Sequence, residues 1–298
     1  RAGVNAGNSI ESGGNYNVAV GDEAGTAITT GDNNVAIGYS AGAALTTGLS
    51  NILIGSNTGD ALTTASENTA VGHFAMSNNV LGAKNVAIGT STLSATNPAT
   101  AADMYNTAVG FSAGNAVTTG TQNTLIGGLA GDASQTGDAN VAVGYLSFSS
   151  VATGDNNTAI GTRSMFSNTS GSENTGLGKD ALYSNTVGAY NVAVGEGALY
   201  SNVDGSRSVA IGRLALYTQD PASAVDMYNV GIGYDAGGKV TTGTENNLIG
   251  GLAGDALTTG SYNQVLGVAA LTADTLGSRS VAIGHAALYT QNFTTATD

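Results

Sequence analysis

The chain has 298 residues, of which 45 are glycine and none is cysteine or tryptophan, and its 21 acidic and 8 basic residues give a net charge of −13. This acidic balance disfavours a nucleic-acid partner, and the lack of cysteine excludes disulfides and thiolate zinc sites. No stretch approaches eighteen consecutive apolar residues, so we expect no membrane insertion by this segment, yet a hydrophobic content of 41% is too high for a disordered linker.

A short repeat organises the chain from residue 17 to residue 298, and residues 1–16 are expected to form an irregular N-terminal coil. Each repeat contains a segment like NVAIG, and its closing glycine is taken as position 0 of the repeat. These glycines are Gly21, Gly38, Gly55, Gly72, Gly89, Gly110, Gly127, Gly144, Gly161, Gly178, Gly195, Gly212, Gly233, Gly250, Gly267 and Gly284. The step between them is 17 residues, except for two steps of 21 residues.

The two long steps carry four-residue insertions near residues 97–105 and 220–228, and these insertions hold the only prolines, Pro98 and Pro221. Both insertions end in Asp-Met-Tyr. The stretch 85–148 also resembles the stretch 208–271, at an offset of 123 residues, so the chain grew by duplication of blocks. Because Asp298 falls inside what would be a third long step, we expect the sequence to be a fragment of a longer protein.

The residue at position −1, just before the glycine, is always aliphatic, and position −2 is usually alanine. We expect the position −1 side chains to form the core; the candidates are Ile37, Ile54, Ile88, Ile126, Ile160, Ile211, Ile249 and Ile283. Adjacent residues of a strand point to opposite faces, so both faces of these segments are apolar and both need a cover. One cover is the interior of the coil, and the sequence predicts another chain on the alanine face.

Positions +4 and +7 vary together. Where position +4 is glycine, as at Gly42, position +7 is usually a large aliphatic residue, as at Leu45, and where position +4 is large, position +7 is usually polar. Ser134 and Val151 are the exceptions. Such compensation keeps the volume of each layer constant and is typical of stacked coils. A 17-residue unit is too short for a helix pair, so we predict an all-β parallel β-solenoid of about sixteen coils, without helices.

Asparagine opens the expected strand in nearly every repeat, with Ser208 and Ser280 in its place twice. The representative positions are Asn34, Asn51, Asn68, Asn85, Asn123, Asn157 and Asn191. One interpretation is a glycan-binding array. We favour a structural ladder, in which each amide hydrogen-bonds its counterparts in adjacent layers, because the position lacks the variety that ligand recognition requires.

No catalytic constellation recurs in one register. The two histidines, His73 and His285, both follow a recurring glycine, at a position that varies freely and is expected to be an exposed rim. We therefore predict that the segment is not an enzyme and that it uses neither a metal nor another cofactor.

Tyrosines form two groups that could make up a receptor surface by stacking on sugars. Tyr39, Tyr145 and Tyr234 share the rim position, and Tyr183, Tyr200, Tyr217 and Tyr289 share another register. The alternative is that they shield the edges of the coils. Threonine pairs such as Thr29 and Thr30 raise a third possibility, an ice-binding face, although they occur only in coils with glycine at position +4.

The units at residues 34–42 (NVAIGYSAG) and 191–202 (NVAVGEGALYSN) resemble the repeats of phage tail-fibre-domain proteins and, more loosely, the head repeats of trimeric autotransporter adhesins. The resemblance implies a homotrimeric, left-handed β-coil fibre that is extracellular, on a virion tail or on a bacterial surface. We accordingly expect a structural and adhesive fibre shaft whose partners are its own copies and a glycan or protein receptor on a cell surface. The alternatives are a bacterial trimeric adhesin head and, third, an ice-binding solenoid.

Overall fold

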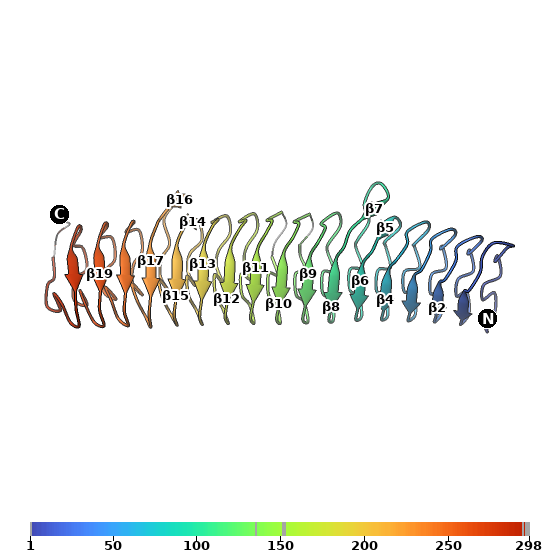
Figure 1. Cartoon of the computed structure of the whole chain (residues 1–298), viewed down its shortest axis with the longest axis horizontal. Helices are drawn as coiled ribbons and strands as arrows, with labels where there is room; N and C mark the ends of the chain where they lie inside the picture. Colours follow the sequence, from blue (N-terminus) through green and yellow to red (C-terminus); the bar gives the residue numbers. More distant parts are fainter. Residues whose placement is uncertain (1, 135, 151–152, 294, 296–298) are drawn as a thin grey trace. The chain divides into compact units, whose positions relative to one another are not determined.

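The computed structural model describes residues 2–134, 136–150, 153–293 and 295, and the chain divides into two compact units, unit 1 (residues 1–153) and unit 2 (residues 154–298). Each unit is an all-β parallel solenoid with about 17 residues per turn, as predicted, and the described residues contain no helix. Figure 1 shows the short strands of each unit side by side, joined by turns.

The main sheet of unit 1 has the order β1-β2-β3-β4-β6-β8-β9-β10, and that of unit 2 has the order β11-β12-β13-β15-β17-β18-β19-β20. The strands of unit 1 are β1 (Val18–Val20), β2 (Val35–Ile37), β3 (Ile52–Ile54), β4 (Thr69–Val71), β5 (Gly82–Ala83), β6 (Val86–Ile88), β7 (Ala102–Asp103), β8 (Thr107–Val109), β9 (Thr124–Ile126) and β10 (Val141–Val143). Those of unit 2 are β11 (Thr158–Ile160), β12 (Thr175–Leu177), β13 (Val192–Val194), β14 (Gly205–Ser206), β15 (Val209–Ile211), β16 (Val225–Asp226), β17 (Val230–Ile232), β18 (Asn247–Ile249), β19 (Gln264–Leu266) and β20 (Val281–Ile283).

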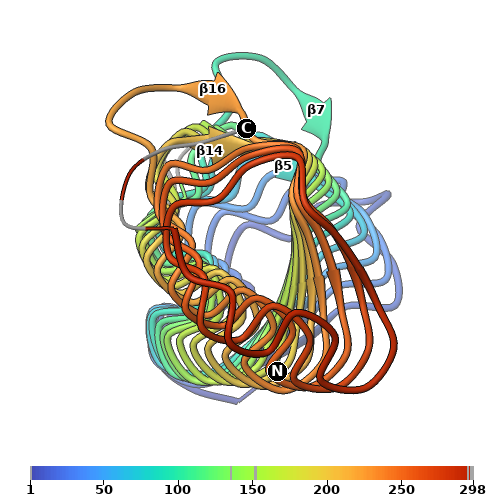
Figure 2. The same cartoon turned by 90° about the vertical axis from the view of Figure 1, so that its left-hand side faces the viewer.

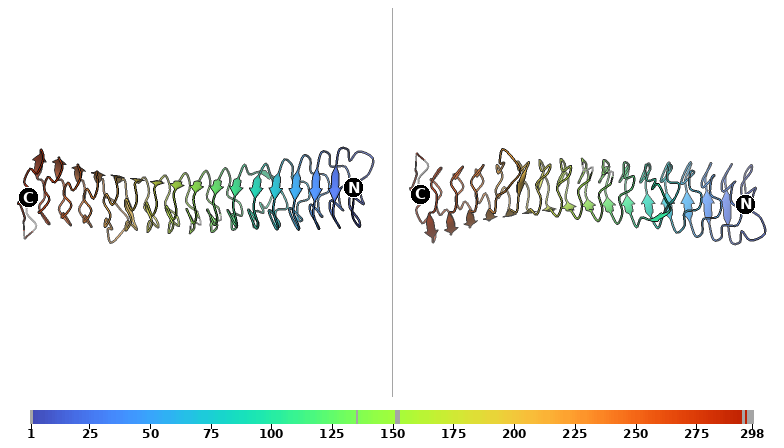
Figure 3. Two further views of the ribbon diagram at one scale, coloured as in Figure 1. Left: turned by 90° about the horizontal axis from the view of Figure 1, so that it is seen from below. Right: turned by 90° about the horizontal axis from the view of Figure 1, so that it is seen from above.

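The strands pair in the register that the repeat dictates, so that equivalent positions of successive coils are neighbours. Ala36 of β2 lies opposite Leu53 of β3, for example, and Ala193 of β13 opposite Ala210 of β15. Residues 2–16 extend the stack, because the Ala2 amide donates to the Ala19 carbonyl and Ala2 forms a parallel bridge with Val20. Figure 3 shows that the strands lie along one side of the coils in each unit, while turns complete the rest of each coil.

The strand faces are the reverse of the sequence expectation. The position −2 residue points inward and is fully buried, as at Ala36 and Ala210, whereas position −1 points outward. Of the eight isoleucines predicted as core, Ile88, Ile126, Ile211, Ile249 and Ile283 are exposed and Ile37, Ile54 and Ile160 are half-buried. The assignment of these side chains to the interior is therefore wrong. Their size is the physical reason, since larger residues from elsewhere in the coil already occupy the interior and leave room for little more than a methyl group.

Those larger residues come from positions +4 and +7, as the pattern of compensation predicts. Leu45 and Leu93 are both fully buried, although the first occupies position +7 and the second position +4. A Cβ atom added to Gly42 would lie 2.7 Å from Leu53 Cδ1 of the next coil, so the glycine leaves space that a neighbouring leucine fills.

Ser134 departs from that pattern, because its coil has glycine at position +4 and no large residue at position +7. In its coil the inward residue of the strand is Leu125 rather than alanine, and a Cβ atom on Gly131 would lie 2.6 Å from Leu125 Cδ2. Interior volume is thus drawn from three positions of the coil. The second exception, Val151, lies outside the described residues.

The recurring glycine is required by both its conformation and its surroundings. Gly55 has a φ of 137°, in the region that residues with a side chain rarely adopt, and a Cβ atom there would lie 2.6 Å from the carbonyl oxygen of Gly72 in the next coil. Gly161 has the same arrangement, with a φ of 132° and the oxygen of Gly178 at 2.5 Å. Successive backbones therefore approach each other closely along this column of glycines.

Each insertion is fixed to the coil before it by its Asp-Met-Tyr motif. In unit 1, β7 pairs with β5, Asp103 Oδ2 forms an ion pair with Lys84 Nζ at 2.7 Å, and Met104 is buried. The Lys84 ammonium holds the pKa of the Asp103 carboxyl below its usual range. In unit 2, β16 pairs with β14, and Arg207 Nε lies 2.9 Å from Asp226 Oδ1. Figure 2 shows the chain around β7 and around β16 standing out from the outline of the coils.

Candidate interaction surfaces

The outward face of the main sheet of unit 1 is a strip of β-branched side chains. In each strand the first and third residues point outward, and in all eight strands both are Val, Ile or Thr. Many of these side chains are substantially exposed; Ile52, for example, is 41% exposed and Ile126 is 39% exposed. Since the interior is already filled, the single chain leaves this strip uncovered, and the strip is mostly apolar, with threonine hydroxyls at Thr69, Thr107 and Thr124.

The corresponding strip of unit 2 is interrupted at one place. The first residues of β18 and β19 are Asn247 and Gln264, where the other strands of this sheet have Thr or Val. The third residues of the same strands are still aliphatic, Ile249 and Leu266. The outward faces of the two units therefore differ mainly at this polar pair, and Leu177 and Leu266 are the other outward residues of unit 2 that are not β-branched.

The asparagines that precede the strands lie in a buried ladder. Asn51 Nδ2 donates to Asn34 Oδ1 at 3.0 Å and to the Ala65 carbonyl at 3.0 Å, and the Asn51 amide N–H donates to the same Asn34 oxygen. The pattern continues at Asn68 and Asn85 in unit 1 and between Asn157 and Asn174 in unit 2. Asn123 and Asn191 likewise donate to a turn carbonyl of the next coil. Because these amides are buried and paired, this ladder holds the coils together rather than presenting a ligand surface.

The serine replacements in this ladder are matched by glutamine at position +7. Gln219 Nε2 donates to Ser208 Oγ and to Asn202 Oδ1, both at 3.0 Å, and Asn229 Nδ2 donates to Gln219 Oε1 at 2.9 Å. Gln291 Nε2 stands in the same relation to Ser280 Oγ, at 3.2 Å. The amide that the serine lacks is therefore supplied from the opposite arm of the coil, a coupling that the sequence analysis missed although both residues are visible in the sequence.

Three of the candidate receptor tyrosines stack on one another in unit 2. The ring centroids are 5.0 Å apart between Tyr183 and Tyr200 and between Tyr200 and Tyr217, with near-parallel planes, and Phe166 extends the stack at 5.3 Å from Tyr183. Burial between its neighbours raises the pKa of the Tyr200 hydroxyl. Both faces of Tyr183 and Tyr200 are therefore occupied by other rings, whereas Tyr217 has a ring on one face only and Tyr289 is 52% exposed.

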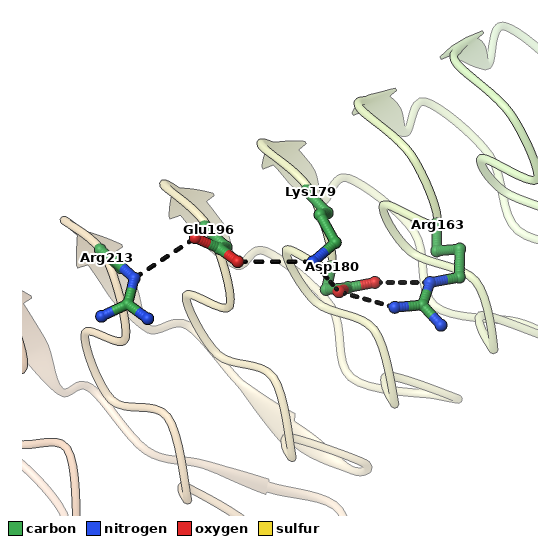
Figure 4. A network of polar contacts seen from close by, with 5 residues as sticks. All are labelled: Arg163, Lys179, Asp180, Glu196 and Arg213. Carbon is green, nitrogen blue, oxygen red and sulfur yellow. Dashed lines mark hydrogen bonds and ion pairs between the residues drawn. The ribbon is translucent and has the colours of Figure 1, made fainter.

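A chain of charged side chains runs across the same coils of unit 2 (Figure 4). Arg163 binds Asp180 through two parallel contacts of 2.8 Å, and Lys179 lies 3.5 Å from Asp180 and 3.4 Å from Glu196. Arg213 completes the chain at 3.3 Å from Glu196. Arg213 and Lys179 lower the pKa of the Glu196 carboxyl. Asp180 is buried, but the other four side chains are about 40–55% exposed, so we expect these pairs to orient the rim side chains more than they stabilise the fold.

The remaining candidates lie on the rim without forming a common site. Tyr39, Tyr145 and Tyr234 are each more than half exposed, and the side chains of His73 and His285 are exposed as well. The first threonine of each pair is engaged in the coil; Thr46 Oγ1, for example, donates to the Thr63 carbonyl at 3.1 Å.

Among the described residues, no group of three histidine or acidic side chains is placed to hold a metal ion. In the same part of the chain, no helix has the length and apolar character needed to span a bilayer. Comparisons with protein-family models, with curated proteins and with solved structures each found no match.

Proposed function

We propose that the chain is a structural and adhesive fibre shaft, similar to a tail fibre, which assembles as a homotrimer outside the cell and presents surfaces for attachment to a cell surface or a glycan. The shaft has no enzymatic activity of its own. The observation that carries the proposal is the outward strip of β-branched side chains in unit 1.

The size of this strip supports a protein partner. Eight strands about 4.8 Å apart, each three residues long at about 3.3 Å per residue, give each unit a flat face on the order of 400 Å². That is comparable with the largest apolar patch on a typical monomer, about 300–600 Å², and patches of this size are often functional. A second and third copy of the chain would cover the strip with an identical pattern of side chains at the same spacing.

Two other functions share the repeat architecture. A bacterial surface adhesin head would use the same trimer and differ only in its attachment to the cell. An ice-binding solenoid would act as a monomer through regular hydroxyls, and the hydrogen bonds from threonine hydroxyls such as that of Thr46 to backbone carbonyls leave fewer of them for ice. Thermal hysteresis with shaping of ice crystals would favour the ice-binding function over the fibre.

Sedimentation equilibrium tests the assembly directly. The proposal expects three times the chain mass of 29.2 kDa. The double variant Ile88→Asp/Ile126→Asp should sediment as a monomer with an unchanged far-UV circular dichroism spectrum, because both side chains point outward from a filled coil. Tyr145→Ala, on the rim, is the control that should leave the mass unchanged. A monomeric wild-type chain would contradict the homotrimer.

A further inference from the structure

The polar interruption in unit 2 is the floor of an open groove. The groove has a volume of about 480 Å³ and is lined by Tyr228, Glu245, Asn247, Tyr262 and Gln264. Tyr228, Glu245 and Tyr262 occupy the same position in three successive coils, so the two rings flank the carboxylate, while Asn247 and Gln264 come from the adjoining strands β18 and β19. The volume falls within the range of small-molecule sites, about 300–1,000 Å³.

We propose that this groove binds an uncharged sugar residue of a glycan; the proposal deepens the adhesive function and rests on it only for the biological role of the site. Two coils separate the tyrosines, which corresponds to about 9–10 Å at the usual strand spacing. One sugar ring fits in that space with contact distances of about 3.5–4 Å on either side. Arg279 lies over the Tyr262 ring at 5.5 Å and belongs to the following coil, so it leaves the face toward Glu245 open.

Asn247 and Gln264 in the floor of the groove, together with Glu245 beside them, supply the hydrogen-bonding groups that the hydroxyls of a sugar ring need. Asn247 Nδ2 donates to Gln264 Oε1 at 2.8 Å, which leaves one amide oxygen and one amide nitrogen of the pair without a partner in the described part of the chain. The Glu245 carboxylate, exposed between the rings, adds an acceptor. A donor, an acceptor and a carboxylate beneath two aromatic rings match the alternating apolar faces and polar edges of a pyranose.

The negative charge of Glu245 selects against anionic sugars. It would also suit a quaternary ammonium group held between two aromatic rings. Such a cation makes no hydrogen bonds, however, and gives no reason for two amides at positions where the rest of the sheet carries Thr or Val. The amide pair therefore favours a neutral sugar over a cationic ligand.

A comparison of the two duplicated stretches shows that they differ at the residues that line the groove. Residues 117–133 and 240–256 are identical at fifteen of seventeen positions, and the two differences, Gln122 for Glu245 and Thr124 for Asn247, both fall in the groove. In the next coil the duplicate has Ala139 and Val141 where the groove has Tyr262 and Gln264. Unit 1 thus carries the same scaffold with four of the five lining residues changed, and only Tyr105 matches its counterpart, Tyr228.

Reversion to the duplicate's residues tests the proposal in the full chain. The quadruple variant has the substitutions Glu245→Gln, Asn247→Thr, Tyr262→Ala and Gln264→Val, each of which unit 1 already accommodates. The probes are methyl glycosides of glucose, galactose, mannose and N-acetylglucosamine, measured by saturation-transfer NMR and calorimetry, with choline chloride and N-acetylneuraminic acid as comparison ligands. At least one neutral glycoside should bind the wild type, and the quadruple variant should lose at least about tenfold in affinity.

The converse variant guards against a loss of binding that merely reflects misfolding. Transplanting the groove into unit 1 by Gln122→Glu, Thr124→Asn, Ala139→Tyr and Val141→Gln should raise the stoichiometry from one sugar per chain to two. Binding of choline but no neutral glycoside, no binding of any probe at tens of millimolar, or undiminished binding by the quadruple variant would each overturn the proposal. Sedimentation of the same samples separates it from the fibre hypothesis, because a trimer without sugar binding contradicts only the groove, and a sugar-binding monomer contradicts only the homotrimer.

Discussion

Two coils of this chain, residues 117–133 in unit 1 and residues 240–256 in unit 2, share their interior and their turns but differ in what they present outward. Leu125 and Leu248 fill the two interiors in the same way, and Ile126 and Ile249 flank them on the outward face with similar exposure, 39% and 37%. Thr124 in the first coil belongs to an unbroken β-branched strip, whereas Asn247 in the second opens a polar groove. The comparison teaches that a solenoid coil separates stability from recognition, because the residues that point inward and outward alternate along the same three-residue strand.

The largest expected effect comes from the column of glycines, which both coils share. Gly127→Ala should cost about 3 kcal/mol or more, because φ is 135° and the added Cβ atom would lie 2.5 Å from the Gly144 oxygen. Gly128→Ala is the matched control, since its Cβ atom would meet only the Tyr145 ring, at 3.6 Å. Thermal unfolding of both variants measures the difference, and equal melting temperatures would mean that the coils do not stack as described.

The inward residues are the same within these two ranges, but the residue that follows each range, at position +7, is Ser134 in unit 1 and Leu257 in unit 2. Both Leu125→Ala and Leu248→Ala should destabilise the fold by about 2–5 kcal/mol, as buried leucine truncations do. The loss should be larger for Leu125→Ala, because Leu257 partly fills the space beside Leu248 while Ser134 leaves the first coil without a second large side chain. Denaturant unfolding of the pair measures this order, and a larger loss for Leu248→Ala would contradict the account of how volume is shared.

The duplicated blocks also differ two steps earlier in the chain, in the coils of Gly89 and Gly212, where one block uses the serine–glutamine pair. Unit 1 has Asn85 and Thr96 where unit 2 has Ser208 and Gln219. Gln219→Thr alone should cost about 1–3 kcal/mol, because it removes the partner of the buried Asn202 and Ser208 side chains. Adding Ser208→Asn recreates the unit 1 pair and should recover most of that loss. A double variant no more stable than Gln219→Thr would show that the two positions are independent.

The outward face provides a contrast in assembly. Ile126→Asp should weaken the proposed trimer more than Ile249→Asp, because Ile126 has only β-branched neighbours on its face, whereas Ile249 lies beside Asn247 and Gln264. Sedimentation velocity over a range of concentrations compares the two variants. A stronger effect of Ile249→Asp would locate the interface away from the unbroken strip.

The smallest effect concerns the carboxylates Asp132 and Asp255, which occupy the same place in the two coils. Ser149 Oγ donates to Asp132, but Asp255 Oδ1 is buried without a hydrogen-bond partner within the described residues, and burial raises the pKa of the Asp255 carboxyl. Protonation therefore favours the folded state, so the penalty is absent at acid pH and grows as the pH rises through the folded pKa. Asp255→Asn should stabilise the fold at pH 7 and so raise its melting temperature. The gain in the free energy of unfolding should be less than about 1 kcal/mol, because the site is partly screened, and it should vanish at acid pH.

For Asp132→Asn we expect no such gain at pH 7, because the change disturbs the hydrogen bond from Ser149. Melting curves of both variants across the same pH range form the comparison. A gain for Asp255→Asn that is independent of pH would rule out the carboxylate as its cause.

The period, the strand positions and the exchange between positions +4 and +7 could all be predicted from the sequence, because each follows from side-chain size repeated in one register. The direction of the strand could not. Ala36 and Ile37 are both apolar, and hydrophobicity alone does not say which faces a narrow interior; the decisive quantity is the volume that Leu45 and Leu53 already occupy. The groove was missed because Asn247 and Gln264 look unremarkable in their own repeats and stand out only against Thr124 and Val141 of the duplicate.

The insertions at residues 97–105 and 220–228 show that a loop can be lengthened without changing the register of the coils. Each departs from the coil near a proline and rejoins it at an Asp-Met-Tyr motif, where an ion pair and a buried methionine fix the return. Sequence added between those two points changes neither the pitch of the solenoid nor the alignment of its strands. Each loop is therefore a place at which a foreign peptide could be displayed without disturbing the 17-residue coils of its own unit.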